Sequence, residues 1–244
     1  MPRFFVTKDR ISENKIYIDG SDAHHIARSL RMAEGDEATV CDGEGVEYRC
    51  SLSRIRDEEC VCEILETRVS ASEPPVRITL CMAYPKGDKL ETVIQKAVEL
   101  GVSCIIPFES SRCIKRPKAE KAEKQNARLS RIAEEAAKQC GRAIIPTVCQ
   151  PMNFKEMLKE AKSADLSLFC YENEDARSIK DALREAGVVS TVSVIVGSEG
   201  GFSPEEAKEA TLAGLSSVTL GNRILRCETA PLYALTAISY EYEL

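Results

Sequence analysis

Two loops near the C-terminal end carry glycines at positions that suit close contact with a bound molecule. The first is residues 196–203, Val-Gly-Ser-Glu-Gly-Gly-Phe-Ser, and the second is 220–230, Leu-Gly-Asn-Arg-Ile-Leu-Arg-Cys-Glu-Thr-Ala. Each follows a short β-branched run, at 191–196 and 217–220, and each precedes a helix start. Glycine has no Cβ, so its amide and carbonyl can approach a ligand closely. We expect both loops at the carboxyl ends of parallel strands, where open α/β sheets bind ligands.

The glycine spacing differs from that of the familiar nucleotide loops. Neither Gly-x-Gly-x-x-Gly nor Gly-x-x-x-x-Gly-Lys-Ser/Thr is present, and Gly197–Gly200 does not fit a nucleophile elbow. The first loop runs into Ser203-Pro204-Glu205-Glu206, a capping box with proline at the first helical position, and Thr229 is expected to cap the closing helix. Either loop alone is equally typical of an ordinary turn, but the two together are much more specific.

Together the loops resemble those of the RsmE family, bacterial methyltransferases that modify N3 of a uridine in small-subunit ribosomal RNA. That family belongs to the SPOUT superfamily of knotted S-adenosylmethionine enzymes. Its loops read approximately Ile-Gly-Pro-Glu-Gly-Gly-Phe and Leu-Gly-x-Arg-Ile-Leu-Arg-x-Glu-Thr-Ala. The second is intact here, and the first has Ser198 where proline is usual, with its glycines and Glu199 in place.

The resemblance implies a SPOUT-type α/β domain, a trefoil-knotted parallel sheet, at residues 73–244, preceded by a PUA-like β-barrel domain at 1–72. The sequence agrees with this division. Short candidate strands fall at 15–18, 37–41, 47–50 and 59–64, with a helix at 21–31. Residues 70–75 have linker composition, and strand–helix alternation typical of an α/β sheet begins at Arg77.

Composition favours a cytoplasmic protein without metal or membrane segments. The 244 residues are 43% hydrophobic, which suffices for a full core, and we expect no signal peptide. No apolar run approaches the ~20 residues of a membrane helix. The 11 cysteines include no Cys-x-x-Cys pair, and His24 and His25 are the only histidines, which argues against zinc and for reduced thiols.

The net charge of −6 does not by itself suggest a nucleic-acid partner, but basic residues gather between Arg112 and Arg142. This stretch has ten basic and four acidic residues, a balance of +6. A basic stripe on an acidic protein can bind phosphates. From charge alone, however, a solvated helix face is the more typical explanation.

The resemblance also implies RNA contacts, in both domains. The candidates are Arg3, His25, Arg28 and Arg31 in the N-terminal domain, and Lys86, Lys96, Arg112, Gln139 and Arg142 in the C-terminal domain. A histidine on a short helix is more often structural, and Lys86 and Lys96 by themselves are typical of ordinary surface lysines. The implied partners are 16S ribosomal RNA or the small ribosomal subunit, and a second copy of the chain bound through the helix that starts near Thr229.

The implied cofactor is S-adenosyl-L-methionine, held mainly by glycine and aliphatic residues. Backbone groups of Leu220, Ile224 and Leu225 are expected to contact its adenine. The implied cofactor contacts are Cys170, Tyr171, Glu172, Val196, Gly197, Gly200, Gly201, Leu220, Gly221, Ile224, Leu225, Arg226 and Thr229.

Transfer to uridine N3 requires that its proton leave before or during the reaction. A positioned carboxylate can accept it, or a cation can stabilise the uracil anion. We expect Arg226 in the second role and Glu199 or Glu228 as proton acceptors. An alternative is that Glu228 and Arg223 form a structural ion pair.

Three other functions remain open at this point. An NAD-type oxidoreductase shares the α/β architecture but lacks its glycine fingerprint here. A noncatalytic RNA-binding ribosome assembly factor would keep the basic stretch without needing a glycine-lined pocket. A SPOUT enzyme acting on another RNA position, such as a tRNA ribose, is the third.

Overall fold

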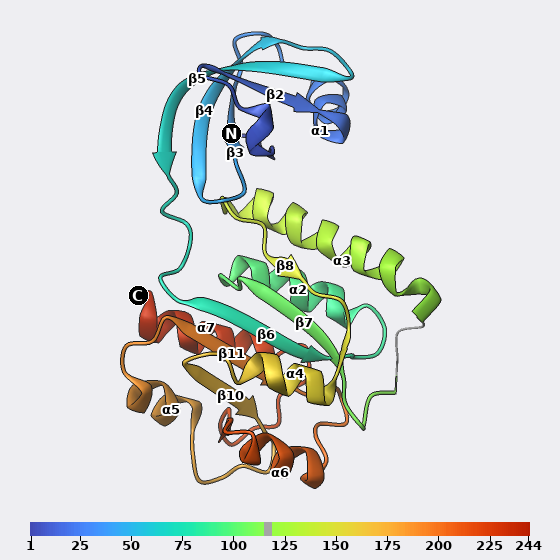
Figure 1. The fold of residues 1–244 in the computed structure, drawn as a ribbon, viewed down its shortest axis with the longest axis vertical. Helices are drawn as coiled ribbons and strands as arrows, with labels where there is room; N and C mark the ends of the chain where they lie inside the picture. The colour runs from blue at the N-terminus through green and yellow to red at the C-terminus, as the bar shows by residue number, and fades with distance from the viewer. Residues whose placement is uncertain (115–118) are drawn as a thin grey trace. The chain divides into compact units, whose positions relative to one another are not determined.

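The computed structural model describes residues 1–114 and 119–244, and the side chains of all these except residues 119–121 (Figure 1). The chain forms two compact units, Met1–Glu73 with Ala137–Ile145, and Pro74–Ala136 with Pro146–Leu244. The sequence interpretation placed 137–145 in the second domain, whereas its contacts lie with the first unit. The domain limits 1–72 and 73–244 remain a proposal.

The attachment of 137–145 has a clear physical cause. The Arg142 side chain is 4% exposed, and its Nη2 atom lies 2.6 Å from Oε2 of Glu73. The same carboxylate accepts the backbone N–H groups of Ala143 at 3.1 Å and Ile144 at 3.2 Å. Lys138 Nζ lies 3.0 Å from Oδ2 of Asp22. Ionic and backbone hydrogen bonds therefore hold this segment within the first unit.

This buried ion pair gives a stability prediction. Glu73→Ala removes the carboxylate from a guanidinium that is almost fully buried, and breaking such a pair typically costs about 3 kcal/mol or more. Urea unfolding should show a loss of that size. The matched control is Glu66→Ala, whose carboxylate makes an exposed pair with Arg49, and it should change stability by less than about 1 kcal/mol. Equal losses in the two variants would refute the assignment.

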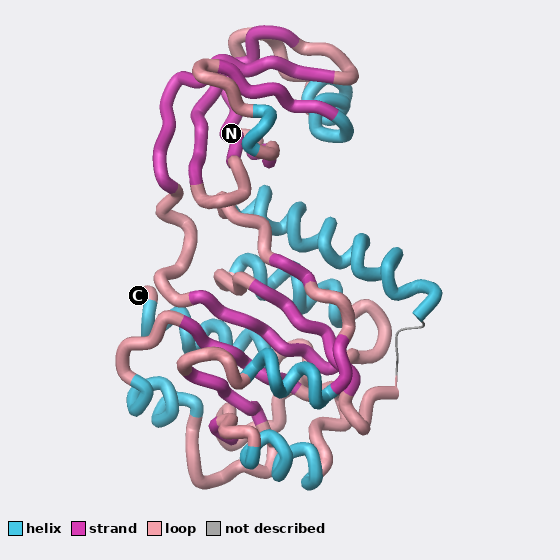
Figure 2. The backbone as a smooth tube through the Cα atoms, viewed as in Figure 1, coloured by secondary structure: helices cyan, strands magenta, loops and turns pink. Residues whose placement is uncertain are grey.

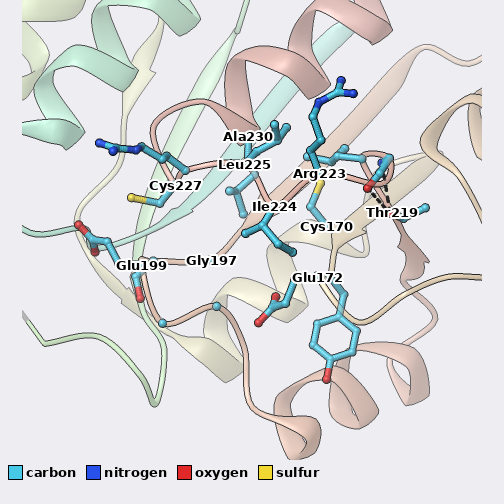
Figure 3. Close-up of a pocket in the computed structure, with 18 of the residues that line it drawn as sticks. Cys170, Glu172, Gly197, Glu199, Thr219, Arg223, Ile224, Leu225, Cys227 and Ala230 are labelled. Atoms are coloured by element: carbon cyan, nitrogen blue, oxygen red, sulfur yellow. Dashed lines mark hydrogen bonds between the residues drawn. The ribbon is translucent and has the colours of Figure 1, made fainter.

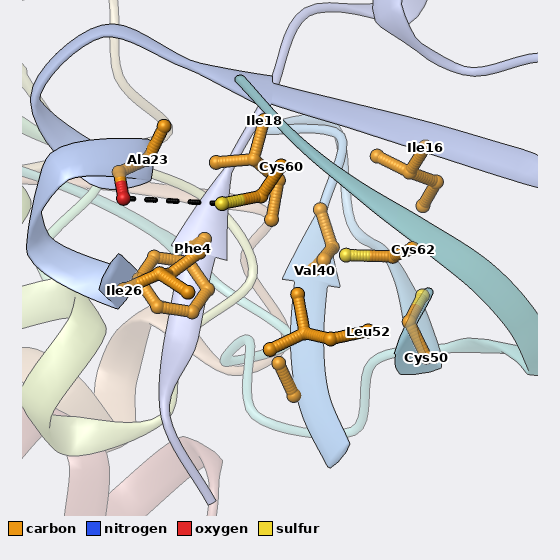
Figure 4. Packing of buried hydrophobic residues seen from close by; sticks show 11 residues of the cluster. Phe4, Ile16, Ile18, Ala23, Ile26, Val40, Cys50, Leu52, Cys60 and Cys62 are labelled. Carbon is orange, nitrogen blue, oxygen red and sulfur yellow. Dashed lines mark hydrogen bonds between the residues drawn. The ribbon is translucent and has the colours of Figure 1, made fainter. Parts of the chain in front are cut away.

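The first unit is built on a curled five-stranded sheet with strand order β1-β3-β4-β5-β2. Its elements are β1 (Arg3–Phe5), η1 (Lys8–Arg10), β2 (Lys15–Asp19), α1 (Gly20–His24), η2 (His25–Ser29), β3 (Glu37–Cys41), β4 (Val46–Arg54) and β5 (Glu59–Val69). The strand β1 pairs parallel with β3, and the other pairs are antiparallel. The core between sheet and helix contains Phe4, Ile18, Ile26 and Cys60, all at most 2% exposed (Figure 4). The predicted strands are confirmed, and the predicted helix is α1 continued by the wider turn η2.

The second unit is a parallel sheet with strand order β12-β10-β11-β6-β7-β8, and β9 also pairs with β7. Its strands are β6 (Arg77–Ala83), β7 (Cys104–Glu109), β8 (Thr147–Val148), β9 (Met152–Asn153), β10 (Leu166–Cys170), β11 (Thr191–Val196) and β12 (Ser216–Val218). Its helices are α2 (Lys89–Glu99), α4 (Phe154–Ala161), α5 (Ile179–Ala186), α6 (Pro204–Leu212) and α7 (Ala230–Tyr242), and α3 (Ala119–Cys140) continues into the first unit. The expected α/β class with a parallel sheet is confirmed.

The helices cover the sheet on both faces (Figure 2). The helix α4 packs on β6, β7 and β11, while α7 packs against α2, α5 and β11. The connections β6–α2–β7 and β9–α4–β10 run in opposite directions across the sheet, so right-handed crossovers place α2 and α4 on opposite faces. Strands buried from both sides need continuous apolar sequence, and β10 is buried at every position.

Three neighbouring strands end at the same edge of this sheet. Cys170, the last residue of β10, pairs with Val196 at the end of β11 and with Val218 at the end of β12. After β12, Thr219 donates its backbone N–H to Arg177 O at 2.9 Å and accepts from the Ile179 N–H at 3.0 Å. The chain that leaves β12 therefore runs alongside the segment after β10. The implied trefoil knot stays a prediction.

The capping predictions have different outcomes at the two helices. Ser203 caps α6 as expected, since its Oγ accepts the Glu206 N–H at 3.2 Å and its own N–H donates to the Glu206 carboxylate at 2.9 Å. Thr229 makes no side-chain cap bond to α7. Its backbone is already helical, because a turn begins earlier with its N–H donating to Arg226 O at 2.8 Å. The prediction for Thr229 as a capping side chain was wrong.

Among the described residues, no helix combines the length and apolar character needed to cross a membrane.

Candidate cofactor pocket and active site

A cavity of about 490 Å³ opens where β10, β11 and β12 end. This volume lies in the range of small-molecule sites, ~300–1,000 Å³. The lining residues are Lys89, Cys170, Tyr171, Glu172, Val196, Gly197, Ser198, Glu199, Gly200, Gly201, Thr219, Leu220, Gly221, Arg223, Ile224, Leu225, Arg226, Cys227 and Ala230. Every predicted cofactor contact is among them except Thr229, which is exposed to solvent and does not line the cavity. Figure 3 shows labelled side chains from all three strand ends around this space.

The first loop needs its glycines for packing against neighbouring loops. A Cβ on Gly201 would overlap the Glu172 carboxylate, and Gly201 has a φ of +61°. A Cβ on Gly200 would lie 3.0 Å from the Arg112 Cβ, and one on Gly197 would lie 3.1 Å from the Gly201 Cα. The sequence analysis explained these glycines only by the space that they leave for the cofactor. The structure adds a second reason, because the loop lies directly on Glu172 and Arg112.

The second loop uses its glycine differently. Gly221 has a φ of +104°, and nothing lies within 4 Å of a Cβ built there. Its backbone N–H donates to the Thr219 Oγ1 at 3.2 Å, and its carbonyl accepts from that hydroxyl at 3.3 Å. Gly221 is therefore required for chain direction rather than for close packing.

An aromatic cluster fixes the base of the first loop. Phe202 is fully buried, and its ring centroid lies 4.3 Å from that of Phe169 on β10 and 6.3 Å from that of Phe108 on β7. Offset aromatic pairs at these distances add to the stabilisation from burial. The loop is thus anchored to two strands of the sheet immediately after its glycines.

Lys89 joins three segments at one side of the pocket, and sequence reasoning did not identify it. Its Nζ atom lies 3.0 Å from Oε1 of Glu199 and 3.1 Å from Oε2 of Glu228. It also lies 3.8 Å from the Cys227 Sγ. The alternative pairing of Glu228 with Arg223 was wrong, since the partner of Glu228 is Lys89. The sequence shows that Lys89 lies at the start of the helix after β6, but nothing in it indicates these partners.

Both carboxylates of this cluster favour the ionised form. Burial raises the pKa of Glu199, but its own backbone N–H, Lys89 and the Lys86 N–H outweigh that effect and leave the pKa below its ordinary value. The Glu228 backbone N–H, with Cys227 and Lys89, lowers the pKa of that carboxyl against a smaller effect of burial. The hydrogen bonds that Lys89 donates to Glu199 and Glu228 raise its pKa. A carboxylate with a lowered pKa is a weak general base.

The geometry of Glu199 is that of an anchor. Its two carboxylate oxygens accept the Lys86 backbone N–H at 3.0 and 3.2 Å, in addition to the Lys89 ion pair. Burial raises the pKa of the Cys227 thiol to about 12, so Cys227 remains protonated and donates to Glu228 at 3.3 Å. The cluster therefore holds the 85–89 segment against both glycine loops.

The lowered carboxyl pKa values set a pH dependence. A group whose folded pKa lies below its unfolded value of about 4.5 adds stability above that pH and loses it as pH falls through the folded pKa. The difference in melting temperature between the native chain and Glu199→Gln should be constant between about pH 6 and 8 and shrink below about pH 4.5. A difference that instead changes near pH 7 would contradict the lowered pKa of Glu199.

Two arginines in the pocket wall differ from Lys89. The side chains of Arg223 and Arg226 line the cavity and are exposed. Within residues 1–114 and 119–244, neither guanidinium has an ion pair or hydrogen bond. Their charge is available to a bound anion, whereas that of Lys89 is already matched by two carboxylates.

The predicted RNA contacts fall into different environments. The structure corrects the prediction that Arg3 and Arg142 contact RNA. The Arg3 side chain is 12% exposed, with Nη1 3.1 Å from Glu47 Oε1 and 2.9 Å from Cys41 Sγ, and Arg142 pairs with Glu73. These guanidinium groups stabilise the first unit, and we withdraw them as phosphate contacts. His25, Arg28, Arg31, Lys86 and Gln139 are exposed, and Arg28 pairs with Asp57.

Arg112 and Lys96 also have local partners. Arg112 Nη1 donates to Gly200 O at 2.9 Å and lies 4.0 Å from Glu172 Oε1, which places it at the rim of the first glycine loop. Lys96 Nζ lies 2.8 Å from Glu99 on the next turn of α2. Of the basic stretch, Lys115, Arg116 and Lys118 lie outside the described residues, as does the Lys121 side chain. Arg128 pairs with Glu91 and Arg131 with Glu135, so the described part is largely neutralised.

Comparison with known proteins decides the family. A model described as an RNA methyltransferase domain matches residues 72–239, and one described as an RNA methyltransferase PUA domain matches residues 18–65. The ribosomal RNA small subunit methyltransferase E (RsmE) of Bacillus subtilis (strain 168) is 36% identical over 253 residues, covering 100% of this chain and 98% of the relative. The chain belongs to the RsmE family. The match also confirms the PUA-like character of the first unit.

Further RsmE relatives agree over nearly the whole chain. The protein of that name from Synechocystis sp. (strain ATCC 27184 / PCC 6803 / Kazusa) is 31% identical, covering 97% of this chain and 77% of the relative. A crystal structure of the RsmE of Neisseria gonorrhoeae bound to S-adenosyl methionine matches with a TM-score of 0.85 and 32% identity, over 98% of this chain and 97% of that one. Fold and family are therefore the same across both units.

The pocket residues fit S-adenosylmethionine. Gly197, Gly200 and Gly201 all line the cavity, so backbone groups form that part of its wall. The Ser198 Oγ is buried and has no hydrogen-bond partner among the described atoms. Within the described residues, no group of three or more His, Cys, Asp or Glu side chains is placed to hold a metal ion.

Proposed function

We propose that this chain transfers a methyl group from S-adenosyl-L-methionine to N3 of a uridine in 16S ribosomal RNA of the small subunit. The observation that carries the proposal is the cavity formed where both glycine loops meet the end of β10. Membership of the RsmE family supports the reaction and its RNA class, and the SAM-bound gonococcal relative supports the cofactor. Isothermal titration with S-adenosylmethionine and with NADH tests the pocket, and only the first should bind.

The bound cofactor supplies an electrophilic methyl group on a sulfonium that carries its own leaving group. The chain must therefore position the two reactants and manage one proton. Gly197, Gly200, Gly201 and the 220–225 backbone are proposed to hold the cofactor by main-chain groups. Glu172, 31% exposed at its side chain and bounded by Gly201 and Arg112, offers a carboxylate to the cofactor's hydroxyl groups.

Arg226 is proposed to stabilise the negative charge that develops on the uracil as N3 loses its proton. It lines the cavity and has no described carboxylate partner, so its charge is not already balanced. Preorganised charge of this kind contributes strongly to catalysis in a site that excludes water. Glu228 remains the proposed proton acceptor. Its lowered pKa makes it a weak base, so stabilisation of the uracil anion by Arg226 is proposed to carry most of the proton loss. Glu199 is proposed as an anchor instead.

The anchor role of Glu199 gives a separable result. Glu199→Gln keeps the side-chain shape but removes the charge that matches Lys89 and holds the Lys86 N–H. We expect the dissociation constant of S-adenosylmethionine to rise about tenfold, with the single-turnover rate at saturating cofactor unchanged within about twofold. Equilibrium binding and rapid-quench methylation measure the two quantities separately. A large fall in the single-turnover rate with unaltered binding would restore Glu199 as a proton acceptor.

Assembly and location are also proposals. We propose that the protein is cytoplasmic, where its proposed ribosomal RNA substrate is found. We also propose a homodimer that uses α7, because Tyr233 and Tyr240 on this helix are 44% and 72% exposed. Large aromatic residues on a surface helix are typical of protein interfaces. Light scattering after size exclusion should give twice the chain mass of 26.9 kDa, and Tyr240→Glu should shift it towards the monomer.

A further inference from the structure

Two of the cysteines that are not fully buried lie side by side outside the cofactor pocket. Of the 11 cysteines, only Cys104, Cys140 and Cys149 are partly exposed, and all 11 lie within the described residues. The Sγ atoms of Cys104 and Cys149 are 3.5 Å apart. Both residues belong to the second unit, and neither lines the cavity.

The sheet brings these thiols together at its edge. Cys104 begins β7 and pairs with Thr147 of β8, the last strand of the sheet on that side. Cys149 follows β8, and its backbone N–H donates to Ile105 O at 2.9 Å, which continues the pairing. Because side chains alternate along a strand, Cys149 projects from the same face as Thr147 and therefore as Cys104.

The hydrogen bond between the thiols favours the thiolate form of one of them. The Cys104 thiol, by donating to Cys149, lowers the pKa of Cys149 to about 7, while the same interaction raises the pKa of Cys104. Thiolates are the nucleophilic form of cysteine. By contrast, burial raises the pKa of Cys50, Cys62 and Cys170 to about 12, so those thiols stay protonated.

We propose that Cys104 and Cys149 form an oxidation-sensitive dithiol that closes to a disulfide on exposure to a hydroperoxide. The Cys149 thiolate attacks a peroxide oxygen, the O–O bond breaks, and a sulfenic acid forms with release of hydroxide or alkoxide. The Cys104 sulfur then attacks the sulfenic sulfur, the S–O bond breaks, and water leaves. In sum, two thiols and one hydrogen peroxide give one disulfide and two waters.

Closure requires a small movement. The sulfurs must approach from 3.5 Å to the bonded distance of about 2.05 Å. The pairing between β7 and β8 covers only two residues, and β8 is an edge strand, so few backbone hydrogen bonds resist the shift. Oxidation at this place involves no residue assigned to cofactor or RNA binding, so the inference stands apart from the proposed methyl transfer.

The test uses the full chain treated with hydrogen peroxide, blocked with an alkylating reagent, and read by intact and peptide mass spectrometry. We expect a loss of 2 Da, a peptide linked through Cys104 and Cys149, and full reversal by a reducing agent. Cys140→Ser is the matched control, since Cys140 is partly exposed on α3 with its thiol donating to Ala137 O. It should leave the link unchanged.

Two variants keep the result decisive. Cys149→Ser should abolish the link and slow oxidation of Cys104. Cys104→Ser, whose hydroxyl can still donate to Cys149 but cannot form a disulfide, should leave a sulfenic acid on Cys149 that a dimedone probe traps. Circular dichroism melting confirms that each variant is folded. Alkylation of both Cys104 and Cys149 after Cys140 has been oxidised would overturn the proposal. So would separate sulfinic acids on the two residues without any linked peptide.

Discussion

Gly201→Ala should weaken binding of S-adenosylmethionine by more than about tenfold, the largest effect on affinity that we expect from one methyl group. Two costs coincide at this position. The added Cβ would overlap the Glu172 carboxylate, and the φ of +61° is strained for any residue with a side chain. The loop or Glu172 must move, and both line the cavity. Isothermal titration calorimetry measures the change directly.

The chain offers a matched control for Gly201. Gly214 also has a positive φ, +96°, but nothing lies within 4 Å of a Cβ built there, and it sits between α6 and β12 outside the cavity. Gly214→Ala should cost about 1 kcal/mol of stability from backbone strain and leave affinity for the cofactor unaltered. If both variants bind equally well, close packing at Gly201 does not shape the pocket.

Arg226→Ala should lower the single-turnover rate of methyl transfer by about 10²–10³-fold. The reason is the loss of a pocket cation whose charge no described carboxylate balances, at the step where charge develops on the uracil. Rapid-quench kinetics at saturating cofactor and RNA isolate this step from binding. Arg226→Lys should recover part of the rate, since it restores the charge without the planar guanidinium.

The control for Arg226 is an arginine far from the cavity. Arg184 is exposed on α5 and outside the cavity lining, so Arg184→Ala should leave the rate within about twofold of the native value. An Arg226→Ala variant that loses only RNA affinity, with its single-turnover rate intact, would make this residue a substrate contact and remove it from the chemistry.

Local sequence patterns predicted the strands that build the pocket. The β-branched run 191–196 is β11, and the run at 217–220 overlaps β12. These predictions worked because a strand covered on both faces has to be continuously apolar. The two glycine loops could likewise be assigned to strand ends, because a helix start follows each of them at a short distance.

The residues that sequence reasoning missed depend on long-range contacts. Lys89 lies 110 residues before Glu199 and 139 before Glu228, and nothing local marks it as their shared partner. The same limit applies to Arg142. In the sequence it belongs to a basic stretch and looks solvent-exposed, yet Glu73, far from it along the chain, buries and neutralises it. Charge patterns report composition along the chain, whereas ion pairing depends on the folded neighbours.

The sequence analysis explained the glycines of the first loop only in part. Their positions indicated a close approach of backbone to ligand, but Gly201 also accommodates a carboxylate from the segment after β10. That constraint arises only when β10 and β11 pair side by side. A one-dimensional pattern cannot separate the two causes, whereas the Gly201 and Gly214 variants can.

The most direct measurement of the central claim follows the methyl group itself. The native chain is incubated with small ribosomal subunits from cells that lack this protein and with S-adenosylmethionine carrying a deuterated methyl group. The ribosomal RNA is then digested and its nucleosides are identified by mass spectrometry. We predict labelled N3-methyluridine from a single position, absent with Gly201→Ala at low cofactor concentration. Label on a ribose or another base, or no label in the RNA, would contradict the account.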